Sequence, residues 1–185
     1  MKFNMRHLIY LIRPNVDVSW WACPNPPLGL GYLASYLESQ GFRVDILDLA
    51  ILKITNVTLF KLIEKNAPLL VGLTALTPFY LNMKELSQEI KKRFPEIPVV
   101  LGGVHASAMP RETLDECDAD FVVIGEGEVT LLELAREIKE HGDFSGVDGI
   151  AYRRGREVIV NKPRALIDDL NSLPMPAWHK IDPRK

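Results

Sequence analysis

Short apolar runs alternate with longer amphipathic stretches along the first 140 residues of the chain. The runs are typical of buried strands, and each ends where a glycine, a proline or a polar residue interrupts the pattern. We predict strands at residues 7–12, 42–49, 69–77, 97–103 and 120–125. The stretches between them keep helical spacing. We predict helices at residues 28–40, 57–66, 80–93, 111–117 and 130–140.

The predicted helices carry apolar side chains that would pack on a sheet. In the helix over residues 130–140 these are Leu131, Leu134, Ala135 and Ile138. In the helix over residues 80–93 they are Leu81, Leu86 and Ile90. Strands that alternate with such helices predict an α/β fold whose parallel sheet is covered on both faces. We expect a doubly wound, flavodoxin-like or Rossmann-like sheet of five parallel strands in the order 2-1-3-4-5, with right-handed crossovers.

The pattern changes after residue 145. Two apolar-polar segments, residues 147–152 and 157–160, flank a compact turn and predict a β-hairpin. The rest of the chain is rich in proline and has little periodicity, which is typical of an ordered linker. We therefore expect an α/β domain over residues 1–145, followed over 146–185 by a hairpin and a linker that leads to a further domain.

The charge and the cysteine content of the chain limit the partners and the cellular compartment that we expect for it. The formal net charge of −2 gives no basic field that would attract nucleic acid or an anionic membrane, so neither is an expected partner. The sequence shows no membrane-spanning run and no signal peptide. Its two cysteines, Cys23 and Cys117, are far apart, and we expect them to be reduced thiols of a cytoplasmic protein.

Glycines at the ends of two predicted strands indicate where a ligand binds. Gly102 and Gly103 end the fourth strand, and Gly125 and Gly127 follow the fifth. Glycine lets a ligand approach the backbone where a Cβ would block it. In parallel α/β sheets the ligand lies at the carboxyl ends of the strands, so we predict a shared ligand edge there.

Polar residues lie beside these glycines. Thr74 and Thr77 stand at the tip of the third strand and would form a polar shelf next to Gly102. Glu126 and Glu128 are expected to orient or hydrogen-bond, because no metal cluster or nucleophile accompanies them. His105 follows the double glycine, and the sequence leaves open whether it has a local partner or contacts a ligand.

A long loop over residues 15–27 separates the first strand from the first helix. Loops of this length are often functional. It contains Trp20, Trp21 and Cys23. Two adjacent tryptophans cannot both face one core, so we expect at least one to cover a ligand or to contact a partner.

Two other families that share parallel α/β folds fit less well. Residues 29–34 match the dinucleotide pattern GxGxxA, with Asp45 and Asp48 further on, but the loop over 15–27 separates that pattern from the first strand. The glycines therefore favour close helix packing or ligand approach. A phosphorelay receiver needs an aspartate after its third strand and a lysine after its fifth, where this chain has Thr74 to Thr77 and Glu126.

Three motifs in this order carry a family resemblance. They are residues 26–34 (PPLGLGYLA), 101–107 (LGGVHAS) and 121–128 (FVVIGEGE). The chain resembles the amino-terminal cobalamin-binding domain of B12-dependent radical SAM proteins. The hairpin and the segment 167–178 also resemble what precedes the radical SAM barrel there, so the similarity covers essentially the whole chain.

The resemblance implies a site for cobalamin across the carboxyl edge of the sheet, with the nucleotide tail of the cofactor threaded into the fold. The loop over residues 15–28 would face the corrin ring. Carried over by position, the cofactor-binding residues would be Asn15, Thr74, Leu76, Thr77, Gly102, Gly103, Val104, His105, Gly125, Glu126 and Gly127.

Two departures limit what this chain does by itself. B12 domains of mutases carry DxHxxG, whose histidine ligates cobalt, whereas residues 17–22 here are DVSWWA, so we expect no cobalt ligand from this loop. The CxxxCxxC of radical SAM domains is absent, and two cysteines cannot hold three irons of a [4Fe-4S] cluster. We predict no catalytic and no metal-ligating residue in this chain.

The resemblance implies that the full protein joins this module to a radical SAM domain that holds a [4Fe-4S] cluster and S-adenosylmethionine. Its expected reaction is methyl transfer to an unreactive carbon of a small molecule. Cobalamin would carry the methyl group. The alternative is a degenerate B12-type domain that binds no cofactor and serves as a docking scaffold for the barrel.

Overall fold

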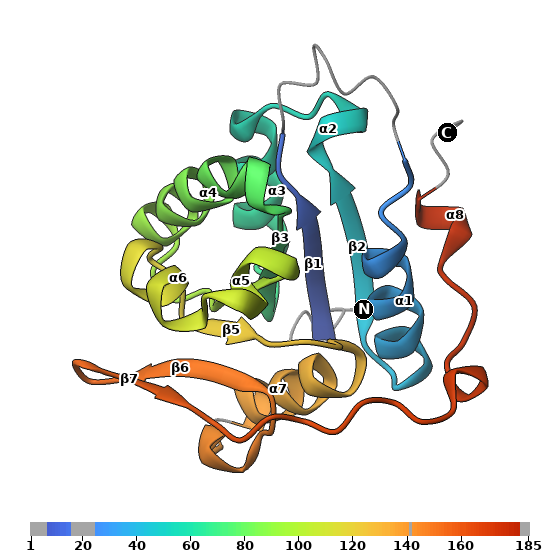
Figure 1. The fold of residues 1–185 in the computed structure, drawn as a ribbon. Helices are drawn as coiled ribbons and strands as arrows, with labels where there is room; N and C mark the ends of the chain where they lie inside the picture. Colours follow the sequence, from blue (N-terminus) through green and yellow to red (C-terminus); the bar gives the residue numbers. More distant parts are fainter. Residues whose placement is uncertain (1–6, 16–24, 141, 182–185) are drawn as a thin grey trace.

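The computed structural model describes residues 7–15, 25–140 and 142–181. Its centre is one sheet of seven strands in the order β2-β1-β3-β4-β5-β6-β7 (Figure 1). The strands β1 to β5 are parallel, as predicted, and β6 and β7 are antiparallel. The strands are β1 (Leu8–Arg13), β2 (Arg43–Asp48), β3 (Leu70–Thr74), β4 (Val99–Gly102), β5 (Phe121–Val123), β6 (Ile150–Arg154) and β7 (Glu157–Val160).

Helices cover both faces of this sheet, which is therefore doubly wound (Figure 1). One face is covered by α1 (Leu28–Ser39), α7 (Glu128–Glu140) and α8 (Trp178–Ile181). The other face is covered by α2 (Leu49–Leu52), α3 (Asn56–Asn66), α4 (Tyr80–Arg93), α5 (Val104–Ala108) and α6 (Pro110–Glu116). Short 3-10 turns are η2 (Thr77–Phe79), η3 (Phe144–Gly146) and η4 (Leu170–Ser172).

Each face of the sheet has its own apolar core, because successive side chains of a strand point to opposite faces. Ile9 and Leu11 of β1 pack under α1 and α7, whereas Leu8, Tyr10 and Ile12 pack under α3 and α4. The predicted apolar face of α7 is confirmed, since Leu131, Leu134, Ala135 and Ile138 are all buried.

One predicted helix face is partly wrong. Leu81 of α4 is 66% exposed, and the helix buries Met83, Leu86, Ser87 and Ile90 instead. Residues three or four positions apart lie on the same face of a helix. Leu81 is five positions before Leu86, so it does not share the buried face.

The predicted hairpin forms, but it joins the main sheet, so the expectation of five strands is corrected to seven. Strand β6 pairs with β5 in antiparallel register, with Val123 opposite Ile150 and Phe121 opposite Tyr152. Both Ile150 and Tyr152 are buried. Without β6, the edge of β5 would present unpaired backbone groups and lose this apolar cover.

We call residues 161–181, which follow the hairpin, the strap. The strap runs from β7 at one edge of the sheet past α7 to α1 and β2 at the other edge (Figure 1). The Arg164 guanidinium donates to Thr130 Oγ1 at 2.8 Å and pairs with Glu133. At its far end, the Ala177 N–H donates to the Gly31 carbonyl at 3.0 Å, and Lys180 Nζ donates to the Val44 carbonyl at 2.7 Å. The segment predicted as a linker is thus fastened along the domain.

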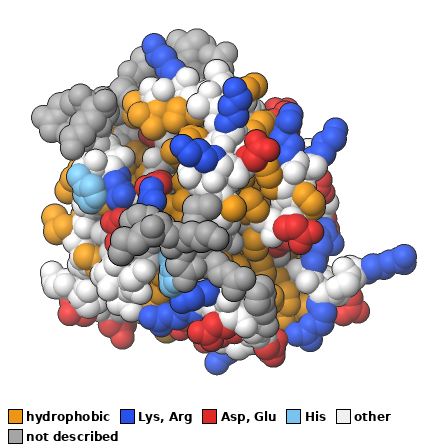
Figure 2. Space-filling model, turned by 180° about the vertical axis from the view of Figure 1, so that it is seen from behind, with side chains coloured by type: hydrophobic (Ala, Val, Ile, Leu, Met, Phe, Trp, Pro, Cys, Tyr) orange, Lys and Arg blue, Asp and Glu red, His pale blue; other side chains and the backbone are white. Residues whose placement is uncertain are grey.

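The charge distribution agrees with the small net charge of the sequence. Lys and Arg side chains are interspersed with Asp and Glu on the face shown in Figure 2, without a single-sign field. In the part of the chain that the structure describes, no helix has the length and apolar character needed to cross a membrane.

Candidate functional site

The predicted glycines and threonines come together at the carboxyl edge of the sheet. Thr74 ends β3 and lies opposite Gly102, which ends β4. The turn η2 follows β3, helix α5 follows β4, and the loop of residues 124–127 follows β5. The strand order reverses between β1 and β3, and ligands of doubly wound folds bind at such a switch point. Asn15, which is exposed, follows β1 at this point.

The two adjacent glycines of this edge have different roles. Gly103 has φ +93°, a conformation that favours glycine, and a Cβ there would lie 2.6 Å from Thr74 Oγ1 and 3.0 Å from the Ala75 carbonyl oxygen. Gly103 therefore lets β4 turn closely past the end of β3. A Cβ at Gly102 would meet nothing within 4 Å. Gly102 is the glycine that leaves this edge open to a ligand.

Exposed apolar side chains follow both strands that meet at Gly102, namely β3 and β4. Leu76 is 53% exposed and Val104 is 66% exposed, although each lies only two residues after the end of a buried strand. Thr74 is half-buried and Thr77 is exposed. The third strand was predicted to reach Thr77, but it ends at Thr74, because Pro78 and η2 interrupt the ladder. The edge thus combines hydroxyl groups with apolar contact surface.

His105 has a partner within the fold. Its ring stacks on that of Tyr80 in α4, with the centroids 4.0 Å apart and the planes at 32°. The Tyr80 hydroxyl donates to Glu116 Oε2 at 3.0 Å, and Lys84 Nζ donates to the same oxygen at 3.0 Å. Burial raises the pKa of Tyr80, and the hydrogen bond from Lys84 lowers the pKa of Glu116. His105 thereby joins α5 to α4, and a contact with a cofactor stays a prediction.

The loop after β5 is held from several sides. The Ile124 N–H donates to the Gly149 carbonyl at 2.9 Å, and the Gly125 N–H donates to Ser107 Oγ at 3.0 Å. Gly125 has φ +78°, and a Cβ there would meet nothing within 4 Å. At Gly127 a Cβ would lie 3.0 Å from a methyl group of Leu33 in α1. Gly125 is therefore open to a ligand, whereas Gly127 permits packing.

The two glutamates of this loop differ in their surroundings. Glu126 Oε2 accepts a hydrogen bond from the Ile167 N–H of the strap at 2.7 Å. Glu128 begins α7, and burial raises the pKa of its carboxyl group. Glu126 therefore has a hydrogen-bond partner within the fold. Its contact with a cofactor stays a prediction.

The residues of the dinucleotide pattern have other partners. Asp48 pairs with Arg13, whose Nε lies 2.9 Å from Asp48 Oδ1, and this pair joins the carboxyl ends of β1 and β2. Arg13 also donates to the Asn25 carbonyl at 2.9 Å. A Cβ at Gly31 would lie 2.8 Å from Ile181 Cδ1. Gly31 therefore allows the strap to pack closely against α1. This packing accounts for the glycine, so a bound nucleotide is not required to explain it.

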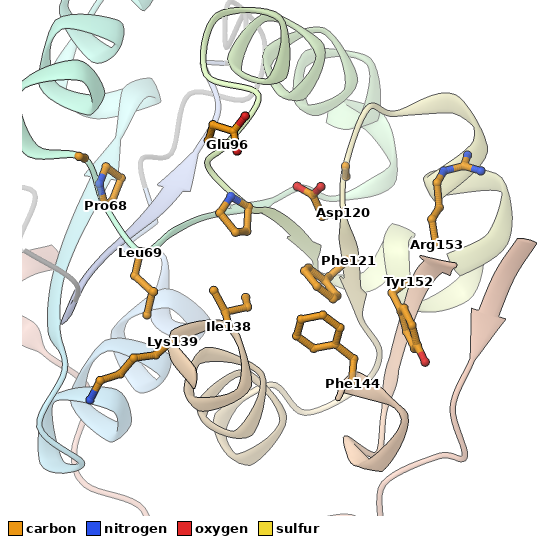
Figure 3. A pocket seen from close by; sticks show the side chains of 13 residues that line it. Pro68, Leu69, Glu96, Asp120, Phe121, Ile138, Lys139, Phe144, Tyr152 and Arg153 are labelled. Carbon is orange, nitrogen blue, oxygen red and sulfur yellow. The ribbon is translucent and has the colours of Figure 1, made fainter. Parts of the chain in front are cut away.

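A separate hollow of about 590 Å³ lies at the opposite, amino edge of the sheet. The rings of Phe121, Phe144 and Tyr152 gather at one side of it (Figure 3). Leu69 at the start of β3 and Pro98 before β4 also line it. None of the predicted site residues does, so the hollow is distinct from the candidate site.

The residues described at the carboxyl edge are compatible with a ligand such as cobalamin, since none of them closes the space over Gly102 or Gly125. Two open glycines and two exposed apolar side chains border this edge. The described residues hold no group of three or more potential metal ligands. The loop predicted to face the corrin, with Trp20, Trp21, Cys23 and the altered DxHxxG, lies outside the described residues over positions 16–24.

Comparisons with known proteins point the same way. Residues 23–135 match the family described as "B12 binding domain". An uncharacterized methyltransferase of Pyrococcus horikoshii is 34% identical over 83% of this chain and 33% of its own length. An anaerobic magnesium-protoporphyrin IX monomethyl ester cyclase of Synechocystis is 31% identical over 86% of this chain and 32% of its own. The chain thus spans about a third of the length of these curated relatives.

A solved structure shows the same fold. The radical S-adenosylmethionine methyltransferase TsrM from Kitasatospora setae, with cobalamin and a [4Fe-4S] cluster bound, superposes with a TM-score of 0.76. It is 29% identical in sequence, and the match covers 91% of this chain and 31% of that one.

Proposed function

The chain belongs to the B12 binding domain family, and we propose that it binds cobalamin across the carboxyl edge of β1, β3, β4 and β5. The family membership confirms the resemblance stated from the sequence, and the chain is homologous to cobalamin-dependent radical SAM methyltransferases. The observation that carries the proposal is the opening at Gly102, which has no neighbour within 4 Å of a Cβ and lies at the end of a central strand.

Each part of this edge has a proposed role. Thr74 and Thr77 would bond the polar groups of the cofactor tail through their hydroxyls. Leu76 and Val104 would cover apolar surface of the cofactor, and their exposure in the chain by itself supports this. The open backbone at Gly102 and Gly125 would let the tail pass the ends of β4 and β5.

When bound, cobalamin supplies a cobalt ion that can carry a methyl group to be transferred. The protein's own task in this proposal is to orient the cofactor and to bury its tail. We propose that the chain has no catalytic or metal-ligating residue of its own. Its two cysteines are too few to bind three irons of a [4Fe-4S] cluster.

The activity of the whole protein is a further part of the proposal. Relatives named as methyltransferases and as cyclases favour a radical reaction at a carbon of a small molecule, of which we propose methyl transfer. The strap would connect this module, residues 1–145 with the hairpin, to a radical SAM domain that holds S-adenosylmethionine and a [4Fe-4S] cluster. The proposed location is the cytoplasm, where a free thiol such as that of Cys117 persists.

The test is a titration of the purified chain with hydroxocobalamin, followed by visible absorption and by co-elution in gel filtration. We expect saturable binding by the wild type. Gly102→Phe should abolish it, because the ring would fill the opening while the backbone is undisturbed. Gly146→Phe is the matched control, since Gly146 also has open space around it but lies away from this edge.

Gly103 would not serve this purpose, because any side chain there strains the backbone and contacts Thr74 whether or not a cofactor binds. An absence of binding by the wild type, or equal binding by Gly102→Phe, would contradict the proposed site. Absence of binding would favour the alternative of a docking scaffold without cofactor.

A further inference from the structure

The strap is anchored at both ends, and between these anchors one hydrogen bond joins it to the other described residues of the domain. Arg164 holds its beginning on α7, and Ala177 holds its end on Gly31. Among the described residues, the strap between these two positions is joined to the domain by the bond from the Ile167 N–H to Glu126 Oε2, at 2.7 Å. The hydrogen bonds of Asp169 and Ser172 stay within the strap.

The acceptor of this bond, Glu126, lies in the loop of residues 124–127 at the carboxyl edge of the sheet. Glu126 stands between Gly125 and Gly127. The two residues before it are also hydrogen-bonded, Gly125 to Ser107 and Ile124 to Gly149. A carboxylate that accepts from a backbone N–H makes a charge-assisted bond, which is stronger than a neutral one. A displacement of the loop therefore strains or breaks the Glu126–Ile167 bond, which couples the loop to the strap.

The geometry points to Glu126 as a positioning residue: we propose that it ties the loop of residues 124–127 to the strap, so that occupancy of the carboxyl edge sets how tightly the strap is held. This inference rests on the proposed function, because it takes the ligand to be cobalamin. A ligand beside Gly125 restricts the loop and so opposes the opening that breaks the Glu126–Ile167 bond. The strap would then transmit the occupancy of the site to the radical SAM domain of the proposed function.

The first experiment needs no cofactor. Hydrogen exchange of the backbone amides is measured in the wild type, Glu126→Ala, Glu126→Gln and Asp168→Ala. In Glu126→Ala we expect exchange at Ile167 to become at least tenfold faster, with faster exchange also at residues 125–127. Glu126→Gln keeps an oxygen acceptor and should restore part of the protection.

Asp168→Ala is the matched control. It removes a carboxylate from the strap one residue from Ile167, and Asp168 is exposed. We expect exchange at Ile167 to stay within twofold of the wild type in this variant. Equal exchange at Ile167 in Glu126→Ala and Asp168→Ala would overturn the proposed tie.

The second experiment adds hydroxocobalamin. Saturating cofactor should slow exchange at Ile167 several-fold in the wild type and not in Glu126→Ala. Because coupling between two sites is reciprocal, Glu126→Ala should weaken hydroxocobalamin binding by the same factor. A wild type that binds hydroxocobalamin with no change at Ile167 would overturn this inference and leave the proposed function standing. A wild type that binds none would overturn the proposed function, whereas the cofactor-free exchange would still decide whether Glu126 holds the strap.

Discussion

Gly31 offers a sharp test of how the strap is seated, because a second glycine in the same helix provides the control. A Cβ at Gly31 would lie 2.8 Å from Ile181 Cδ1 and 3.2 Å from Pro176 Cβ. A Cβ at Gly29 would meet nothing within 4 Å. Both glycines lie in the first turn of α1, so replacement by alanine gives both a similar gain in helix propensity of up to about 1 kcal/mol.

The difference between Gly31→Ala and Gly29→Ala therefore isolates the steric contact with the strap. An additional methyl group in a packed site costs about 1–3 kcal/mol. We expect Gly29→Ala to raise the free energy of unfolding by up to about 1 kcal/mol. The free energy of unfolding of Gly31→Ala should be lower than that of Gly29→Ala by about 1–3 kcal/mol. Urea unfolding followed by fluorescence measures both, and unchanged m-values would show that the difference is one of stability.

Ile181→Val removes the atom that the new methyl group would contact, since valine lacks Cδ1. In the wild type this substitution should cost about 0.5–1.5 kcal/mol, as for other buried isoleucines. In the Gly31→Ala background it should cost less or stabilise, which gives a coupling free energy of about 0.5–3 kcal/mol. If the two alanine variants are equally stable and Ile181→Val costs the same in both backgrounds, the strap is not seated on Gly31.

Two further predictions concern a buried hydroxyl group, that of Thr113, and a partly buried carboxyl group, that of Glu128. Thr113 is fully buried and its Oγ1 has no hydrogen-bond partner among the described residues, so Thr113→Val should raise the free energy of unfolding by about 1 kcal/mol in thermal or urea denaturation. Burial raises the pKa of Glu128 above 4.5, so its ionised form destabilises the fold at neutral pH. Glu128→Gln should therefore be more stable than the wild type at pH 7. This advantage should shrink as the pH falls through the folded pKa and vanish below 4.5; an advantage that persists there would contradict the assignment.

The five parallel strands were predictable because four of them are continuous apolar runs, β2 alternates apolar and polar residues, and amphipathic helices lie between them. Their order is the flavodoxin-like one expected for such a fold. The pairing of the hairpin was not predictable, since alternation identifies two antiparallel strands without showing that Ile150 lies opposite Val123. The short helices α2 and α5 were missed as well. Residues 104–108 make little more than one helical turn, which is too short for a periodic signal.

The location of the candidate site followed from its glycines, but their separate roles did not. Gly102 and Gly103 are adjacent and identical in the sequence. The first has open space around it, whereas the second is required by φ +93° and by the approach of Thr74. In the same way, the glycine pattern in α1 gave no sign that Gly31 contacts Ile181, because the two are distant in sequence and no local pattern links them.

The carboxyl edge must keep its shape before a ligand arrives, so its residues divide into those that build it and those that stay open. The pair of Arg13 and Asp48, the stack of His105 on Tyr80 and the turn at Gly103 already have their partners in the fold. Substitution of these residues would change binding and folding together. Gly102, with Leu76 and Val104 beside it, has space or exposed surface instead. In the proposed site a ligand gains contacts with this second group as well as with Thr74, Thr77 and Gly125. Substitutions at Gly102, Leu76 and Val104 should therefore separate recognition of the ligand from stability of the fold.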